Sequence, residues 1–214
     1  MSLQDLSLRS VKSYNRFKEF NLQTHHIVEL ILRYIIGFNY KKIKKISISI
    51  LPFEPKVMVL DAGNVMLIKR KVDLDPFFEL SDLDKSYYLL DLIVDSLSLL
   101  YKGNKPLESM VSNAYKLCLE KKCTNEFIHG EITYSINKNY YGYFICHHKI
   151  NVFEIEGQIY DNEGIIVFSK TIVSCAPYWL EYSEFLGHVI WEDCGLVLYD
   201  TSKSEKIICE FKGN

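Results

Sequence analysis

Residues 127–173 read FIHGEITYSINKNYYGYFICHHKINVFEIEGQIYDNEGIIVFSKTIV. This stretch contains four runs rich in β-branched and aromatic residues, separated by short polar segments. The runs span residues 127–136, 140–147, 150–160 and 164–173. Such residues favour strands. Because strands joined by short turns must pair antiparallel, the stretch predicts a four-stranded β-meander.

The strand-rich pattern continues to the C-terminus. A short helix is predicted from Pro177 to about Phe185, and three more strands are predicted over 187–192, 196–200 and 206–211. Turn residues separate these strands, so we expect them to extend the antiparallel arrangement.

Helical periodicity is concentrated in the first half of the chain. Residues 82–102 repeat apolar side chains at spacings of three and four, and Ser81 with Asp84 forms a capping-box pattern in which Asp replaces the usual Glu or Gln. Residues 24–36, with Thr24 as N-cap, and residues 106–121 predict two further helices. Residues 1–22 are weakly amphipathic and predict an arm or a frayed helix.

Three strands are predicted between these helices, over 43–51, 57–60 and 65–70, the last two joined by the turn Asp61-Ala62-Gly63-Asn64. Helices grouped before strands favour an α+β class over α/β. We therefore expect helices, mainly in the N-terminal half, to pack on largely antiparallel β-sheet, with a C-terminal β-meander. Residues 1–214 are predicted as one domain. It can be subdivided into a helix-rich half with a three-stranded sheet (1–124) and a meander half (125–214).

Composition and charge narrow the class of partner. The chain has 214 residues and a formal net charge of −2, without the basic surplus of a dedicated nucleic-acid binder, so nucleic acid is not favoured. The most apolar run, residues 27–38, is short and interrupted by Glu29 and Arg33, so no membrane partner is expected. The abundance of Ile, Lys, Asn and Tyr is typical of an AT-rich microbial genome, which suggests a bacterial protein.

The cysteines indicate the compartment. There are six at irregular spacings, and the N-terminus MSLQDLSLRS lacks the apolar core of a signal peptide. We therefore expect free thiols and a cytoplasmic location.

Chemical motifs are sparse in the sequence. It has no phosphate-binding loop and no nucleophile elbow. His25, His26 and Glu29 share a helical turn, and Cys146 and His148 share a strand face, but neither set completes a metal site. Glu154 and Glu156 share a strand face, which is more typical of a solvated surface than of a catalytic dyad. We predict no catalytic residue, no metal and no cofactor.

Two surface features remain. Asp84, Tyr88, Asp91 and Asp95 fall on the outward face of the helix over 82–102, where their spacing gives an acidic row suited to a basic partner. Tyr178 and Trp179 begin an aromatic segment, and Tyr and Trp are enriched in binding hot spots. Core packing is the favoured interpretation for Trp179, whereas Tyr178 is expected to stay outside.

These features favour a non-enzymatic intracellular protein-binding module, such as an inhibitor or immunity-type protein that docks a basic partner. The partner is expected to be another protein, and the oligomeric state stays open. An enzyme with a non-motif active site and a structural or assembly subunit remain alternatives. The partner-binding residues proposed are the following: Asp84, Tyr88, Asp91, Asp95, Tyr178 and Trp179.

Overall fold

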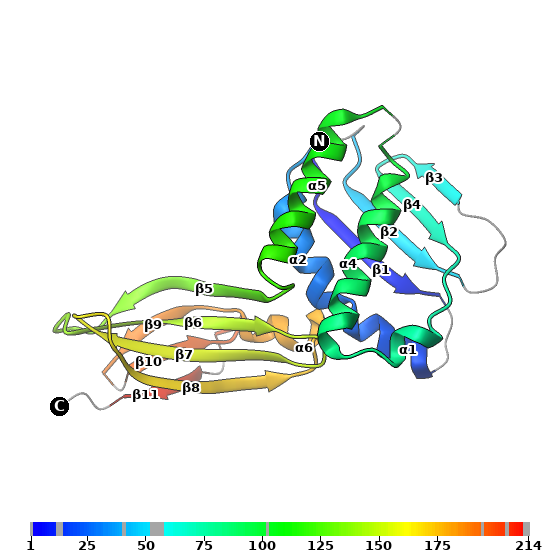
Figure 1. The fold of residues 1–214 in the computed structure, drawn as a ribbon. Helices are drawn as coiled ribbons and strands as arrows, with labels where there is room; N and C mark the ends of the chain where they lie inside the picture. The colour runs from blue at the N-terminus through cyan, green and yellow to red at the C-terminus, as the bar shows by residue number, and fades with distance from the viewer. Residues whose placement is uncertain are drawn as a thin grey trace. The chain divides into compact units, whose positions relative to one another are not determined.

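The computed structural model describes residues 2–11, 15–39, 42–51, 58–101, 103–193, 195–203 and 206–211 (Figure 1). The predicted α+β class is confirmed, with helices mainly in the N-terminal half and a strand meander in the C-terminal half. The chain divides into two compact units, Met1–Asn125 and Glu126–Asn214. The boundary lies one residue after the subdivision considered in the sequence, and the description as a single domain stays a prediction.

The first unit contains a four-stranded sheet in the order β1-β2-β4-β3. Its strands are β1 (Asp5–Ser10), β2 (Lys45–Ile50), β3 (Met58–Ala62) and β4 (Val65–Arg70). The β3–β4 hairpin is antiparallel as predicted, whereas β1–β2 and β2–β4 are parallel. Antiparallel pairing therefore dominates among the described strands but not at the centre of this sheet. Two helices connect β1 to β2, which is the kind of long crossover that parallel neighbours require.

The prediction of an arm or frayed helix over residues 1–22 is wrong for residues 5–10, which form strand β1. Residues in β1 alternate between buried and more exposed positions, and Leu6 and Leu8 lie opposite Ile46 and Ile48 of β2. Helix α1 (Asn15–Gln23) follows this strand. The strand was missed because its pairing partner lies about forty residues further along the chain, beyond the reach of any local pattern.

The remaining helices of the first unit are α2 (His25–Ile35), α3 (Asp75–Phe78), α4 (Asp82–Ser98) and α5 (Lys105–Glu120). Ser81 caps α4 as predicted, because its hydroxyl accepts the Asp84 N–H at 3.2 Å. Thr24 does not cap α2. Its hydroxyl oxygen instead lies 3.0 Å from the carbonyl oxygen of Leu8, which ties the start of α2 to the end of β1.

The second unit holds two antiparallel sheets. One is the predicted meander of β5 (Asn125–Tyr134), β6 (Tyr140–His148), β7 (Phe153–Asp161) and β8 (Ile166–Cys175), although β5 begins one residue before the unit boundary. The other has the order β11-β10-β9 and consists of β9 (Val189–Glu192), β10 (Gly195–Tyr199) and β11 (Lys206–Glu210). A single helical turn, α6 (Trp179–Tyr182), and the 3-10 turn η1 (Ser183–Phe185) connect the two sheets in the chain.

Close packing of these two sheets forms the core of the second unit. Their facing side chains make one buried cluster, which includes Phe144, Ile155, Leu196 and Cys209. Gly157 of β7 lies at a close approach of the two sheets, since a Cβ atom there would lie 2.7 Å from Cys209 Sγ of β11. The same atom would lie 2.9 Å from Cε1 of Phe144 on the neighbouring strand β6. None of the described helices is both long enough and apolar enough to cross a membrane.

Candidate functional site

The outward side of α4 carries the predicted acidic row. Asp84, Asp91 and Asp95 are all exposed, and their spacing of seven and four residues aligns them over about 16 Å of helix. Asp84 accepts a hydrogen bond from the Ser81 hydroxyl at 2.6 Å, and Asp91 accepts one from the Tyr115 hydroxyl at 2.9 Å. Within the described parts of the chain, none of the three aspartates forms an ion pair.

Tyr88 lies on the same side of α4 but has a different role. Its half-buried ring packs at a tilt against Phe77, with centroids 5.6 Å apart, and its hydroxyl lies 3.5 Å from the Asp73 carbonyl oxygen. Burial, followed by the negative charge of Asp73, raises the pKa of Tyr88. Tyr88 therefore keeps its proton at neutral pH, where its hydroxyl donates to the Asp73 carbonyl oxygen.

Helix α5 extends the acidic surface, which sequence reasoning missed. Burial raises the pKa of Tyr101 to about 12, and the carboxylates of Glu108 and Asp95 add to that rise, so both acids lie within electrostatic range of its hydroxyl. Glu108 is exposed in the first turn of α5. Asp84, Asp91, Asp95 and Glu108 are called the acidic helix face below. Only the packing of α4 on α5 shows that Glu108 belongs to it.

Tyr178 and Trp179 lie in the second unit, so the structure divides the predicted partner-binding residues between the two units. Tyr178 stays 37% exposed, as expected. The interpretation of Trp179 as a core residue is wrong, because this residue is 53% exposed. Tyr182, which is 1% exposed, is the buried aromatic residue of this helix. The helix has only one turn, so it buries a single aromatic face, and the Trp179 ring rests edge-on against Tyr182 at 5.5 Å.

Two of the three histidines considered as metal ligands, His26 and His148, are core residues, whereas His25 is only partly buried. The buried ring of His26 places Nδ1 2.8 Å from the Gln23 carbonyl oxygen and Nε2 2.9 Å from Ser86 Oγ. His148 is also buried, and its ring lies edge-on to the rings of Phe153 and Tyr182, which stack on each other. Over the residues that the structure describes, no three His, Cys, Asp or Glu side chains are arranged to hold a metal ion.

The prediction of free thiols is confirmed for the five described cysteines, and Cys194 lies outside the described residues. Burial raises the pKa of Cys118 to about 12 and those of Cys123 and Cys209 to about 11. These three side chains therefore stay protonated at neutral pH, and a protonated thiol is a poor nucleophile.

A polar network of titratable side chains lies on the outer face of the β5–β8 sheet. His147 places Nδ1 2.9 Å from Glu126 Oε1 and Nε2 3.0 Å from Glu156 Oε2. Glu156 also accepts hydrogen bonds from Gln158, at 2.9 Å, and from Ser169. These two bonds, together with the contact to His147, lower the pKa of Glu156 despite the opposing effect of burial.

This network occupies both ring nitrogens of His147, so the side chain serves to join β5, β6 and β7. The sequence showed that Glu154 and Glu156 share a face, but only the register brings His147 close to Glu156.

No protein-family model matches the chain, and no curated protein or solved structure is detectably similar to it.

Proposed function

We propose that this chain is a non-enzymatic protein-binding module that docks a basic partner through the acidic helix face. The observation that carries the proposal is that Asp84, Asp91 and Asp95 are exposed in one row and form no ion pair within the described residues. Like charges four residues apart on a helix cost roughly 0.2–0.5 kcal/mol. Lysine or arginine side chains of a partner would offset that cost on binding.

The chemistry of the face suits reversible association. Exposed carboxylates contribute little to affinity one by one, but together they steer a positively charged partner and exclude negatively charged ones. Tyr115 adds a hydroxyl whose contact with Asp91 fixes the position of that carboxylate. An inhibitor or immunity-type protein that covers a basic enzyme is the kind of activity this arrangement suits. Free, protonated thiols support a reducing, cytoplasmic compartment.

Affinity capture from lysate of the source organism tests the proposal. The bait is the full chain, and the test variant combines Asp84→Asn, Asp91→Asn and Asp95→Asn. Asn keeps an oxygen that accepts the hydrogen bonds from Ser81 and Tyr115, so the variant removes charge and little else. We expect one stoichiometric partner with a basic surface to bind the wild-type chain at low salt, and to be lost both at high salt and from the test variant.

A matched control variant carries Glu120→Gln, Glu131→Gln and Glu163→Gln, which remove the same charge from exposed positions elsewhere. It should retain the partner. Equal loss from both variants would mean that only net charge matters, and equal retention by both would mean that the partner docks elsewhere. Either result would overturn the assignment of the acidic helix face.

A further inference from the structure

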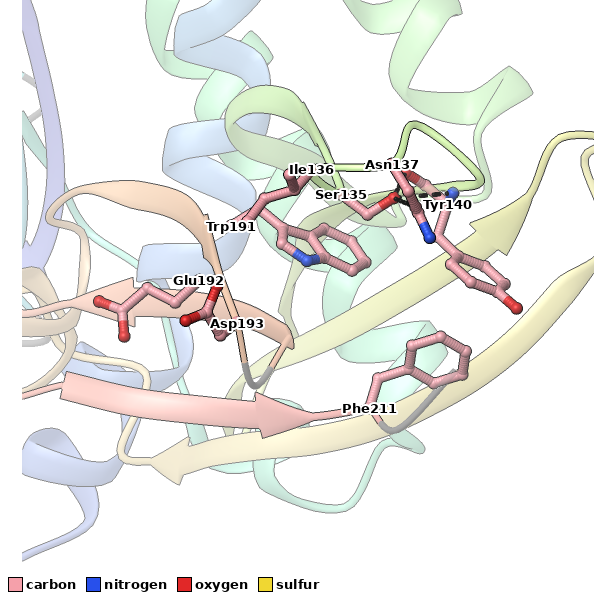
Figure 2. A pocket seen from close by; sticks show the side chains of 8 residues that line it. All are labelled: Ser135, Ile136, Asn137, Tyr140, Trp191, Glu192, Asp193 and Phe211. Atoms are coloured by element: carbon pink, nitrogen blue, oxygen red, sulfur yellow. Dashed lines mark hydrogen bonds between the residues drawn. The ribbon is translucent and has the colours of Figure 1, made fainter. Parts of the chain in front are cut away.

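The second unit contains an aromatic hollow of about 250 Å³, distinct from the acidic helix face. Figure 2 shows Trp191 on one side and the rings of Tyr140 and Phe211 on the other. Those two rings meet edge to face, with centroids 4.8 Å apart and planes at 72°. The other lining residues come from the β5–β6 turn and the end of β9: Ser135, Ile136, Asn137, Glu192 and Asp193.

Hydrogen bonds fix the turn that carries Tyr140. The Ser135 hydroxyl donates to Asn137 Oδ1 at 2.8 Å and accepts the Tyr140 N–H at 3.0 Å, and the Asn139 N–H also reaches Asn137 Oδ1. The Tyr199 hydroxyl donates to Glu192 Oε1 at 2.6 Å on the Trp191 side. These bonds hold the turn that carries Tyr140 and the Glu192 side chain in place without a ligand, and walls that are largely formed in advance are typical of binding sites for small groups.

The lining carries negative charge on an aromatic surface. Glu192 and Asp193 are both acidic, and no Lys, Arg or His is among the described residues that line the hollow. Aromatic ring faces are the negative pole of the ring quadrupole and attract cations. The volume falls below the roughly 300–1,000 Å³ typical of drug-sized ligands, so it suits a group about as large as one side chain.

We propose that this hollow binds an organic cation of the ammonium or guanidinium class, held between Trp191 and the Tyr140–Phe211 pair. The negative charges of Glu192 and Asp193 attract the cation, and the aromatic rings provide the surface that it contacts. The cation is either the end of a lysine or arginine side chain on a partner or a free small molecule, because both present the same chemistry. The site stands on its own observations and goes beyond the proposed function of the acidic helix face.

Titration of the full chain with Nα-acetyl-arginine amide, followed by Trp191 fluorescence in a Trp179→Phe background, tests the proposal. The matched ligand is Nα-acetyl-citrulline amide, which has nearly the same shape but no charge. The arginine compound should bind in a saturable manner and at least about tenfold more tightly than the citrulline compound. Equal binding of the two, or no saturable change with either, would overturn the proposal.

Variants of the lining residues test whether the cation binds in this hollow. Calorimetry measures the affinity of each variant for the arginine compound. Trp191→Ala should weaken binding of the arginine compound by about tenfold, whereas Trp179→Ala, at an exposed tryptophan outside the hollow, should leave it unchanged. Asp193→Asn should weaken it by roughly threefold at low salt, and Glu163→Gln should not. Asp193 is exposed, so this variant keeps the test decisive even if Trp191→Ala fails to fold. Unchanged affinity in Asp193→Asn together with Trp191→Ala, or equal losses in the controls, would contradict the assignment.

A third comparison distinguishes the two sources of the cation, a side chain of a partner and a free small molecule. Free L-arginine and the capped peptide Gly-Arg-Gly carry the same guanidinium group. Tighter binding of the capped peptide would support a partner side chain, and tighter binding of the free amino acid would support a small-molecule ligand. Failure of both to compete with Nα-acetyl-arginine amide would overturn the site.

Discussion

The Glu156 carboxylate is held by side chains from three strands on the outer face of the meander. Gln158 lies two residues along the same strand, Ser169 comes from β8, and His147 comes from β6. Each contact favours the ionised form, so the pKa of Glu156 falls below its ordinary value of 4.5. A group whose pKa is lowered by folding stabilises the fold when the pH is above its unfolded pKa.

Replacing Glu156 by Gln should therefore change how stability depends on pH. Above pH 4.5 the wild-type chain should be more stable by about 1 kcal/mol, because its charged hydrogen bonds are intact. As the pH falls through the lowered pKa, the carboxylate becomes protonated and this difference should shrink. Chemical unfolding of both chains across that range measures it. Glu163→Gln, at an exposed turn position, is the control, and a Glu156→Gln difference that stayed constant or grew in acid would contradict the account.

At the scale of elements, local patterns predicted most of the fold. The meander was predictable because its pairing is between neighbours in the sequence, and α4 because its apolar spacing and its Ser81 cap are both local. Strand β1 and the parallel pairing of β2 with β4 were not, because their partners are set by long-range packing. The exposure of Trp179 depended on a helix of one turn, whose length the sequence did not determine.

The packing of one sheet on the other in the second unit makes a sharp prediction at Gly157. A methyl group there would clash with Cys209 Sγ and Phe144 Cε1, so Gly157→Ala should lower the free energy of unfolding by about 1–3 kcal/mol. Combining it with Cys209→Ala should recover part of that loss, because one of the two clashing atoms is removed. A double-mutant cycle from denaturant unfolding measures the coupling. Purely additive losses would show that the sheets do not meet at this point.

At the scale of the whole molecule, the two units hold different chemistry. The first presents the acidic helix face, and the second presents the aromatic hollow and the exposed Trp179. The sequence was sufficient to place Asp84, Tyr88, Asp91 and Asp95 on one helix. It could not place Glu108 beside them, because that requires the packing of α5, nor could it assemble the hollow from residues as distant in sequence as Tyr140 and Phe211.

Site-specific photo-crosslinking tests the proposed docking most directly. A photoreactive amino acid at Ser98, which is exposed next to Asp95 at the end of α4, reports contact with the acidic helix face, and the same amino acid at Glu163 reports contact with the second unit. The proposal predicts a crosslink from position 98 to a single basic protein, lost at high salt and lost when Asp84, Asp91 and Asp95 are replaced by Asn. A crosslink to that protein from position 163 alone, or one from position 98 that is insensitive to both salt and these substitutions, would contradict it.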